Sequence, residues 1–147
     1  MKGAGESALS ECGVSSNLAT RRTIKAEGFR FTVDPVRKLV KVRFGKKVTV
    51  EEIGRYSMEL RGHPAFEPSF SEVIDLRGAE ELNLEARDFF TLADQLDPFS
   101  PEAMRAFVVR TAVQRHAARM HKVLRVQRNI EIFRSLEEAE RWIESII

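Results

Sequence analysis

Two neighbouring segments of the chain alternate apolar and polar residues with a period of two. Residues 29–33 read Phe-Arg-Phe-Thr-Val, and residues 40–44 read Val-Lys-Val-Arg-Phe. This period is typical of strands that are buried on one side. Residues 34–37, Asp-Pro-Val-Arg, have the composition of a turn, so we predict a β-hairpin. Because the second face of both segments is cationic and polar, we expect the hairpin where only one side of the sheet is covered.

Four helices are predicted from N-terminal capping residues that precede residues with a helical period. Three begin with a capping box, in which a Ser or Thr and a Glu or Gln three residues later bond to free backbone amides. The boxes span residues 49–52, 111–114 and 135–138, and Glu52 is expected to reach back to an amide. Asn83 is the best N-cap for the remaining helix, which should end at Asp97-Pro98. The side chains expected to face inward from the helix after Thr111 are Val113, Ala117, Met120 and Leu124.

Three short apolar runs alternate with the last three helices. They are residues 70–78, FSEVIDLRG, residues 104–109, MRAFVV, and residues 130–133, IEIF. The predicted order is therefore β-β-α-β-α-β-α-β-α, which requires a parallel sheet with right-handed crossovers. We predict an α/β domain with a mostly parallel sheet of about five strands and an antiparallel hairpin strand at its N-terminal side.

Composition limits the domain organisation. The chain has 147 residues, of which 43% are hydrophobic, and this is the size of one domain. Residues 1–22 are rich in Ser and Gly and lack periodicity, so we expect a flexible N-terminal arm followed by a single domain over residues 23–147. Cys12 is the only cysteine, which favours a reducing compartment. With neither an 18-residue apolar run nor a secretory signal, we expect a cytoplasmic protein without a membrane span.

The charge is balanced overall but uneven along the chain. The formal net charge is +2, whereas residues 21–50 carry +8, residues 80–100 carry −5 and residues 101–135 carry +6. A nucleic-acid surface would combine the basic segments with exposed aromatic residues or a helix-turn-helix, and the sequence has neither pattern. A nucleic-acid partner is therefore not expected.

The order of elements and several segments of the sequence together resemble SpoIIAA-like, STAS-type domains. The resemblance is specifically to small bacterial proteins described as STAS or SEC14-like domains. The resemblance covers about Phe29 to Ile146 and depends on the hairpin, the helix from Thr49, and residues 73–78, 106–109 and 132–142. It implies a β-α superhelix that acts as a regulatory or scaffolding module, binds other proteins and sometimes small molecules, and performs no chemistry. Anti-sigma-factor antagonists of this family carry a phosphorylatable Ser where the helix after the middle strand begins. Residues 77–84 contain no Ser or Thr here, so a phosphorylation switch is not expected.

The carboxyl edge of the predicted sheet is the candidate binding surface. Ligands of open parallel sheets meet the carboxyl ends of the strands, where helix N-termini present free amides. We expect an anionic group or an acidic protein segment to dock there, with Arg77, Arg110 and Arg134 giving bidentate contacts. The alternative is that these residues are ordinary solvated charges and helix caps, and that Asp75 only holds the turn at Arg77. The residues predicted at this edge are Lys46, Lys47, Asp75, Arg77, Gly78, Asn83, Arg110, Thr111, Arg134 and Ser135.

Catalytic, metal and cofactor sites are not predicted. His116 and His121 are five residues apart, hence about 140° apart around a helix, which does not suit a shared metal. The sequence has no Cys-X-X-Cys pair, Gly-rich phosphate loop or Gly-X-Ser-X-Gly turn, and no nucleophile is placed to work with Asp75.

A protein partner is therefore the favoured ligand, and a small apolar ligand or lipid is the alternative. The phenylalanines that could line an apolar crevice, or could simply fill the core, are Phe66, Phe70, Phe89, Phe90 and Phe99.

Overall fold

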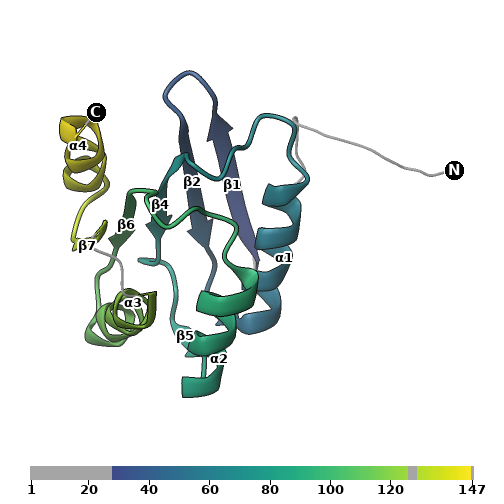
Figure 1. Cartoon of the computed structure of the whole chain (residues 1–147). Coiled ribbons are helices and arrows are strands. Elements are labelled where there is room, and N and C mark those ends of the chain that lie inside the picture. Colours follow the sequence, from purple (N-terminus) through teal and green to yellow (C-terminus); the bar gives the residue numbers. More distant parts are fainter. Residues whose placement is uncertain (1–27, 126–128, 147) are drawn as a thin grey trace, which may run out of the picture.

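Five strands form one mixed sheet in the order β1-β2-β4-β6-β7 (Figure 1). The computed structural model describes residues 28–125 and 129–146, so the predicted arm at residues 1–22 lies outside the described residues. Only the β1–β2 pair is antiparallel, and β2–β4, β4–β6 and β6–β7 are parallel, which confirms the predicted fold class. The strands are β1 (Phe29–Asp34), β2 (Leu39–Phe44), β4 (Ser71–Asp75), β6 (Arg105–Val108) and β7 (Ile130–Phe133).

The predicted hairpin is present and is closed by its acidic residue. Asp34 Oδ1 accepts hydrogen bonds from Val36 N and Arg37 N, each at 3.1 Å, as in an Asx turn. Along β1 the apolar side chains pack against the core, while Arg30 and Thr32 are exposed. The hairpin is therefore covered on one side, as the alternation predicts.

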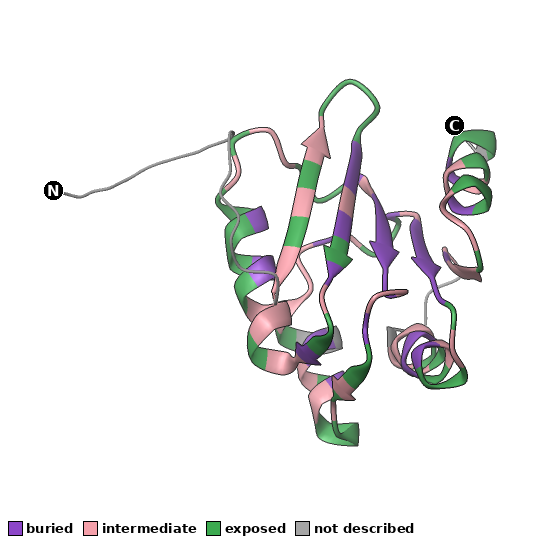
Figure 2. Cartoon of the chain, turned by 180° about the vertical axis from the view of Figure 1, so that it is seen from behind, coloured by how far each residue is buried: buried purple, intermediate pink, exposed green. Residues whose placement is uncertain are grey.

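Helices cover both faces of the sheet. α4 (Leu136–Ile146) lies on one face, where Ala139 and Ile143 pack with side chains of β4 and β6. α1 (Val50–Arg61), α2 (Ala86–Thr91) and α3 (Ala112–Arg125) lie on the other face, over the larger apolar core. Figure 2 shows that burial concentrates in β2, β4 and β6. The central strands are therefore enclosed, and after β4 and β6 the chain becomes accessible only in the loops, at Arg77 and Arg110.

The segment after β4 differs from the prediction. Residues Glu81–Asn83 form a short strand, β5, which pairs in parallel with β3 (Lys47–Thr49) in a separate two-stranded sheet. Asn83 lies opposite Thr49 in this pairing, so the prediction that it caps a helix is wrong. α2 starts three residues later, at Ala86, and Glu85 and Asp88 form its capping box. The helix then continues as a π-helical segment, η2 (Leu92–Leu96).

Two details of the helix predictions also need correction. Thr49 Oγ1 accepts from Glu52 N at 3.2 Å as expected, but Glu52 Oε1 accepts no hydrogen bond from the described part of the chain, and Glu52 Oε2 lies 3.5 Å from Arg55. In α3, Val113 is 63% exposed rather than inward, because the inward position is taken by Gln114, which is fully buried. The Gln114 amide bonds to backbone groups of two loops, and this requirement sets which side of α3 faces the sheet.

Candidate functional site

The predicted edge residues follow the carboxyl ends of β2, β4, β6 and β7, which lie at one edge of the sheet because these strands are parallel. The lysine part of this edge is next to acidic residues. Lys47 lies opposite Glu81 in the small sheet, and the Lys46 carbonyl accepts from Glu80 N and Glu81 N, each at 2.8 Å. Opposite charges therefore lie close together there, and the cationic character of the edge depends on its arginines.

Asp75 and Arg77 form a rigid turn at the end of β4. Asp75 Oδ1 accepts from Arg77 N and Arg77 Nε, and Oδ2 accepts from the Arg77 guanidinium, all at 3.0 Å. Burial opposes ionisation of Asp75, but the hydrogen bonds from Arg77 outweigh it and lower the pKa of Asp75. A Cβ atom at Gly78 would lie 3.4 Å from the Phe44 carbonyl oxygen, so the turn also packs closely on the end of β2. Asp75 therefore holds the turn, and Arg77 is fixed in place.

Gln114 joins the loops after β4 and β6 into one unit. Its Oε1 accepts from Arg110 N at 2.6 Å and from Thr111 N at 3.1 Å, and its Nε2 donates to the Ala79 carbonyl at 2.7 Å. The Thr111 hydroxyl accepts from Gln114 N at 3.2 Å, which completes the predicted capping box. In addition, the Arg110 guanidinium donates to the Arg77 carbonyl at 3.1 Å. The loops that carry Arg77 and Arg110 are therefore held relative to each other by hydrogen bonds.

Arg134 follows β7, the neighbour of β6 in the sheet. Ser135 caps α4 as predicted, since its hydroxyl accepts from Glu138 N at 3.1 Å. Arg134 is exposed, and it lines an open groove together with Arg115 of α3 and Arg141 of α4. The predicted arginines of the edge thus come from three adjacent strands, and two further arginines lie beside Arg134.

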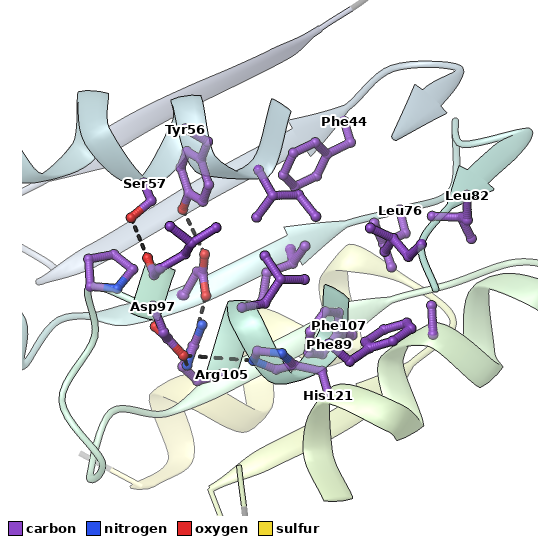
Figure 3. A pocket seen from close by; sticks show the side chains of 18 residues that line it. Phe44, Tyr56, Ser57, Leu76, Leu82, Phe89, Asp97, Arg105, Phe107 and His121 are labelled. Atoms are coloured by element: carbon purple, nitrogen blue, oxygen red, sulfur yellow. Dashed lines mark hydrogen bonds and ion pairs between the residues drawn. The ribbon is translucent and has the colours of Figure 1, made fainter. Parts of the chain in front are cut away.

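A buried cluster of polar side chains lies between the sheet and α1, and the sequence analysis missed it. Arg105 donates to Glu72 Oε1 at 2.8 Å and to Asp97 Oδ2 at 2.7 Å, and the Tyr56 hydroxyl donates to Glu72 Oε2 at 2.6 Å (Figure 3). The side chains of Arg105, Glu72 and Asp97 are each at most 6% exposed. His121 Nε2 lies 3.8 Å from the same Asp97 oxygen.

The charges of this cluster stabilise one another. Burial raises the pKa of Glu72, although attraction to Arg105 and the hydrogen bond from Tyr56 oppose that shift. Burial by itself lowers the pKa of Arg105, but Glu72 and Asp97 outweigh it and raise that pKa. Burial also raises the pKa of Tyr56 well above its usual value. Because these groups are enclosed and bonded to each other, the cluster has the properties of a structural ion network.

A cavity of about 90 Å³ lies beside this cluster, between the sheet, α1, η2 and α3 (Figure 3). Its walls are mainly apolar and include Ile53, Leu82, Phe89 and Ala117. Glu72, Asp97 and Arg105 of the network line one part of the cavity, and apolar side chains make up most of its surface, which suits a small, largely apolar molecule. The cavity is therefore a candidate site for a small apolar ligand.

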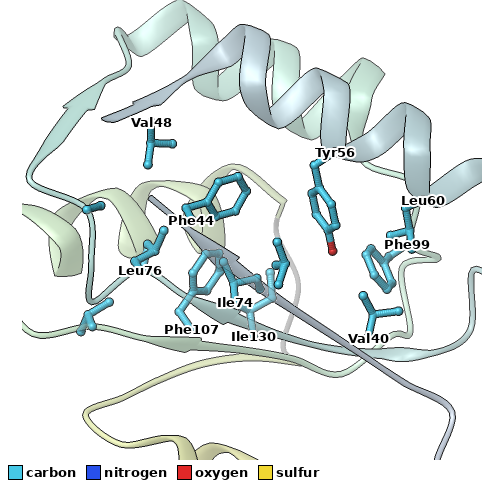
Figure 4. Close-up of a cluster of buried hydrophobic side chains, with 14 of the residues drawn as sticks. Val40, Phe44, Val48, Tyr56, Leu60, Ile74, Leu76, Phe99, Phe107 and Ile130 are labelled. Atoms are coloured by element: carbon cyan, nitrogen blue, oxygen red, sulfur yellow. The ribbon is translucent and has the colours of Figure 1, made fainter. Parts of the chain in front are cut away.

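Most of the phenylalanines considered for an apolar crevice lie elsewhere. Phe89 lines the cavity, but Phe90 is 59% exposed. Phe66 packs against Phe70 and Phe99 with ring centroids 6.1 and 5.2 Å apart, and Phe99 lies in the main hydrophobic core (Figure 4). The core alternative is therefore correct for Phe70 and Phe99.

No group of three or more His, Cys, Asp or Glu side chains in residues 28–125 and 129–146 is arranged to hold a metal ion. Within the same ranges, no helix combines the length and the apolar character needed to cross a bilayer.

Comparisons with known proteins agree with this architecture. No protein-family model matches the chain, and no curated protein matches it. Among solved structures, the chain is similar to the crystal structure of an uncharacterized protein of the DUF3478 family from Shewanella loihica PV-4, which is described as having a SpoIIAA-like fold. The two chains share 16% sequence identity with a TM-score of 0.57, and the match covers 83% of this chain and 98% of that protein. At this identity the similarity concerns the fold, and we conclude that the chain has a SpoIIAA-like fold.

Proposed function

We propose that this domain is a non-enzymatic binding module that docks an acidic segment of a partner protein on its carboxyl edge. The observation that carries the proposal is that three adjacent parallel strands, β4, β6 and β7, are each followed within two residues by an arginine. Arg110 and Arg134 supply the cations, whereas Arg77 is paired with Asp75, and the N-termini of α3 and α4 add partial positive charge at the same edge.

The edge is also preorganised, which supports binding over a purely solvated role. Asp75 fixes Arg77, and Gln114 fixes the backbone that carries Arg110. Side chains and loops that are already ordered lose less entropy when a partner docks. Arg134 and Arg110 form no ion pair with a carboxylate of the described residues, so both are available to pair with a carboxylate of a partner.

The buried ion network gives no support to an enzymatic role. Glu72, Arg105 and Asp97 bond to each other away from solvent, and Asp75 is engaged by Arg77. A general base must reach a substrate proton, and these carboxylates face protein donors instead. We therefore assign the edge a role in recognition, in the cytoplasmic compartment that the lone Cys12 favours.

Reversing the charge of the arginines at the edge is expected to abolish partner capture. The variant Arg110→Glu with Arg134→Glu should bind the partner about tenfold more weakly or worse, because each attractive contact becomes repulsive. The matched control is Lys38→Glu with Arg119→Glu, which makes the same change of net charge at exposed positions outside the edge. The measurement is quantitative pull-down from the native lysate with the wild type and both variants.

If the proposal is correct, the wild type and the control variant capture proteins that the edge variant does not capture. Competition by polyglutamate should release the same proteins. Equal capture by the edge variant and the control would refute the edge as the docking surface.

The cavity supports a second candidate function, the binding of a small apolar molecule. Ala117 is buried and lines the cavity, so Ala117→Leu should occupy part of its volume. We expect native mass spectrometry of the wild-type protein to detect a bound apolar molecule that this variant lacks. Ala112→Leu, which adds the same atoms at an exposed position of α3, is the control. A wild type without such a molecule, or an Ala117→Leu variant that retains it, would exclude this site.

A further inference from the structure

We propose that the acidic segment binds in an extended conformation and adds as a strand to the free edge of β7, in the groove between α3 and α4. This inference rests on the proposed function and names the conformation and chemistry of the ligand. Three observations carry it: the open hydrogen-bonding edge of β7, the shape of the groove beside it, and the charges that line the groove.

The outer edge of β7 has backbone groups available for pairing. Within the described residues β7 pairs only with β6, at the end of the sheet. On the side of β6, the carbonyls of Asn129 and Phe133 accept from Arg105 N and Val109 N, at 2.8 and 2.9 Å. Backbone groups of a strand alternate in direction, so Ile132, which is half-buried, directs its N–H and C=O groups to the free side, whereas Ile130 is fully buried. An extended peptide could bond to these groups, as in strand addition.

A groove of about 540 Å³, open to solvent, lies at the carboxyl end of this edge. Ile132 and Phe133 contribute its apolar floor, and the Phe133 ring contacts Trp142 with centroids 5.6 Å apart. Arg115 of α3 and Arg141 of α4 lie on its two sides. Because side chains of an added strand point alternately to the two faces of the sheet, one set would lie on the side of Arg115 and the other on the side of Arg141, so that an acidic set would meet one of these arginines.

The charges of the groove select an acidic ligand. Arg115, Arg134 and Arg141 line it, and none of them forms an ion pair with a carboxylate of the described residues. Glu138 is the one carboxylate among the residues that line the described groove. The acidic side chains on the opposite side of α4, Glu140 and Glu144, are paired with Arg37. The groove therefore has a cationic excess that the rest of α4 does not share.

The first arm of the test measures charge recognition with a fluorescent peptide of alternating Glu and Val residues. The variant Arg115→Glu with Arg141→Glu should bind this peptide at least about tenfold more weakly than the wild type. Lys38→Glu with Arg119→Glu, which changes net charge equally, should bind it within about twofold of the wild type. Glu138→Gln should strengthen binding several-fold, because the one opposing carboxylate is removed. A peptide of alternating Lys and Val serves as the probe of opposite charge and should not bind.

The second arm tests strand addition. Two versions of the Glu-Val peptide are N-methylated on alternate residues, one on each set of backbone amides. Since one set must pair with β7, only one methylated peptide should retain binding. Hydrogen exchange at the Ile132 amide should slow when the unmodified peptide binds. Equal binding of both methylated peptides would overturn strand addition.

The outcomes separate this inference from the proposed function. If the variant at Arg110 and Arg134 loses its partner while the variant at Arg115 and Arg141 binds the peptide normally, the groove is wrong and the edge stands. If wild-type protein fails to bind the Glu-Val peptide up to its solubility limit, or binds a single-stranded oligonucleotide of equal charge more tightly, the inference is overturned.

Discussion

Replacing Arg105 by Met is expected to lower the free energy of unfolding by about 3 to 5 kcal/mol, since it leaves two buried carboxylates without their cation. Arg105 donates to Glu72 at 2.8 Å and to Asp97 at 2.7 Å, and both carboxylates are almost completely enclosed. The guanidinium also stacks over Phe99, with its carbon 4.6 Å from the ring centroid. Urea unfolding followed by circular dichroism measures the change.

The control for this substitution is Arg119→Met on the exposed side of α3, which should change stability by less than about 0.5 kcal/mol. A loss below about 1 kcal/mol for Arg105→Met would show that the carboxylates do not depend on this arginine.

Replacing Gln114 by Leu is expected to cost about 2 to 4 kcal/mol, because it leaves several backbone groups without a hydrogen-bond partner. The side chain is fully buried, and Leu is close to it in volume, so lost packing is a minor contribution. The groups that lose their partner include the Ala79 carbonyl and the amides of Arg110 and Thr111. Thermal and urea unfolding measure the loss.

The same substitution should also weaken partner binding beyond its effect on stability, because the loops of the edge are no longer held together. Gln95→Leu, at an exposed position of η2, is the matched control and should leave both properties nearly unchanged. A Gln114→Leu protein as stable as the wild type would contradict the role of Gln114 as the link between the loops.

The sequence predicts the main sheet well because its signals are local. The hairpin follows from alternation and a turn, and each later helix has a capping residue close to its start. The failure at Asn83 has a clear cause: pairing between residues 47–49 and 81–83 is a contact between distant, three-residue strands, and neither segment is long enough to show a period.

The buried ion network could not be predicted from local patterns, although two charged residues in the sequence indicate that buried partners are needed. Glu72 and Arg105 each interrupt an apolar strand, and charged residues in enclosed strands require partners. Their pairing depends on the register between β4 and β6, which sets Glu72 opposite Arg105 and which no local pattern encodes. The groove at β7 was missed for a related reason, since Arg115 and Arg141 come from helices that meet only in the folded chain.

A nuclear magnetic resonance titration of the labelled protein with the Glu-Val peptide, recording every backbone amide, shows directly whether an acidic segment docks on the carboxyl edge. We expect the largest shift changes just after β4, β6 and β7, at residues 77–78, 110–115 and 132–135, and we expect them to vanish in the variant Arg110→Glu with Arg134→Glu. Shift changes confined to the residues around the apolar cavity, or a titration that the charge reversals leave unaltered, would contradict docking at this edge.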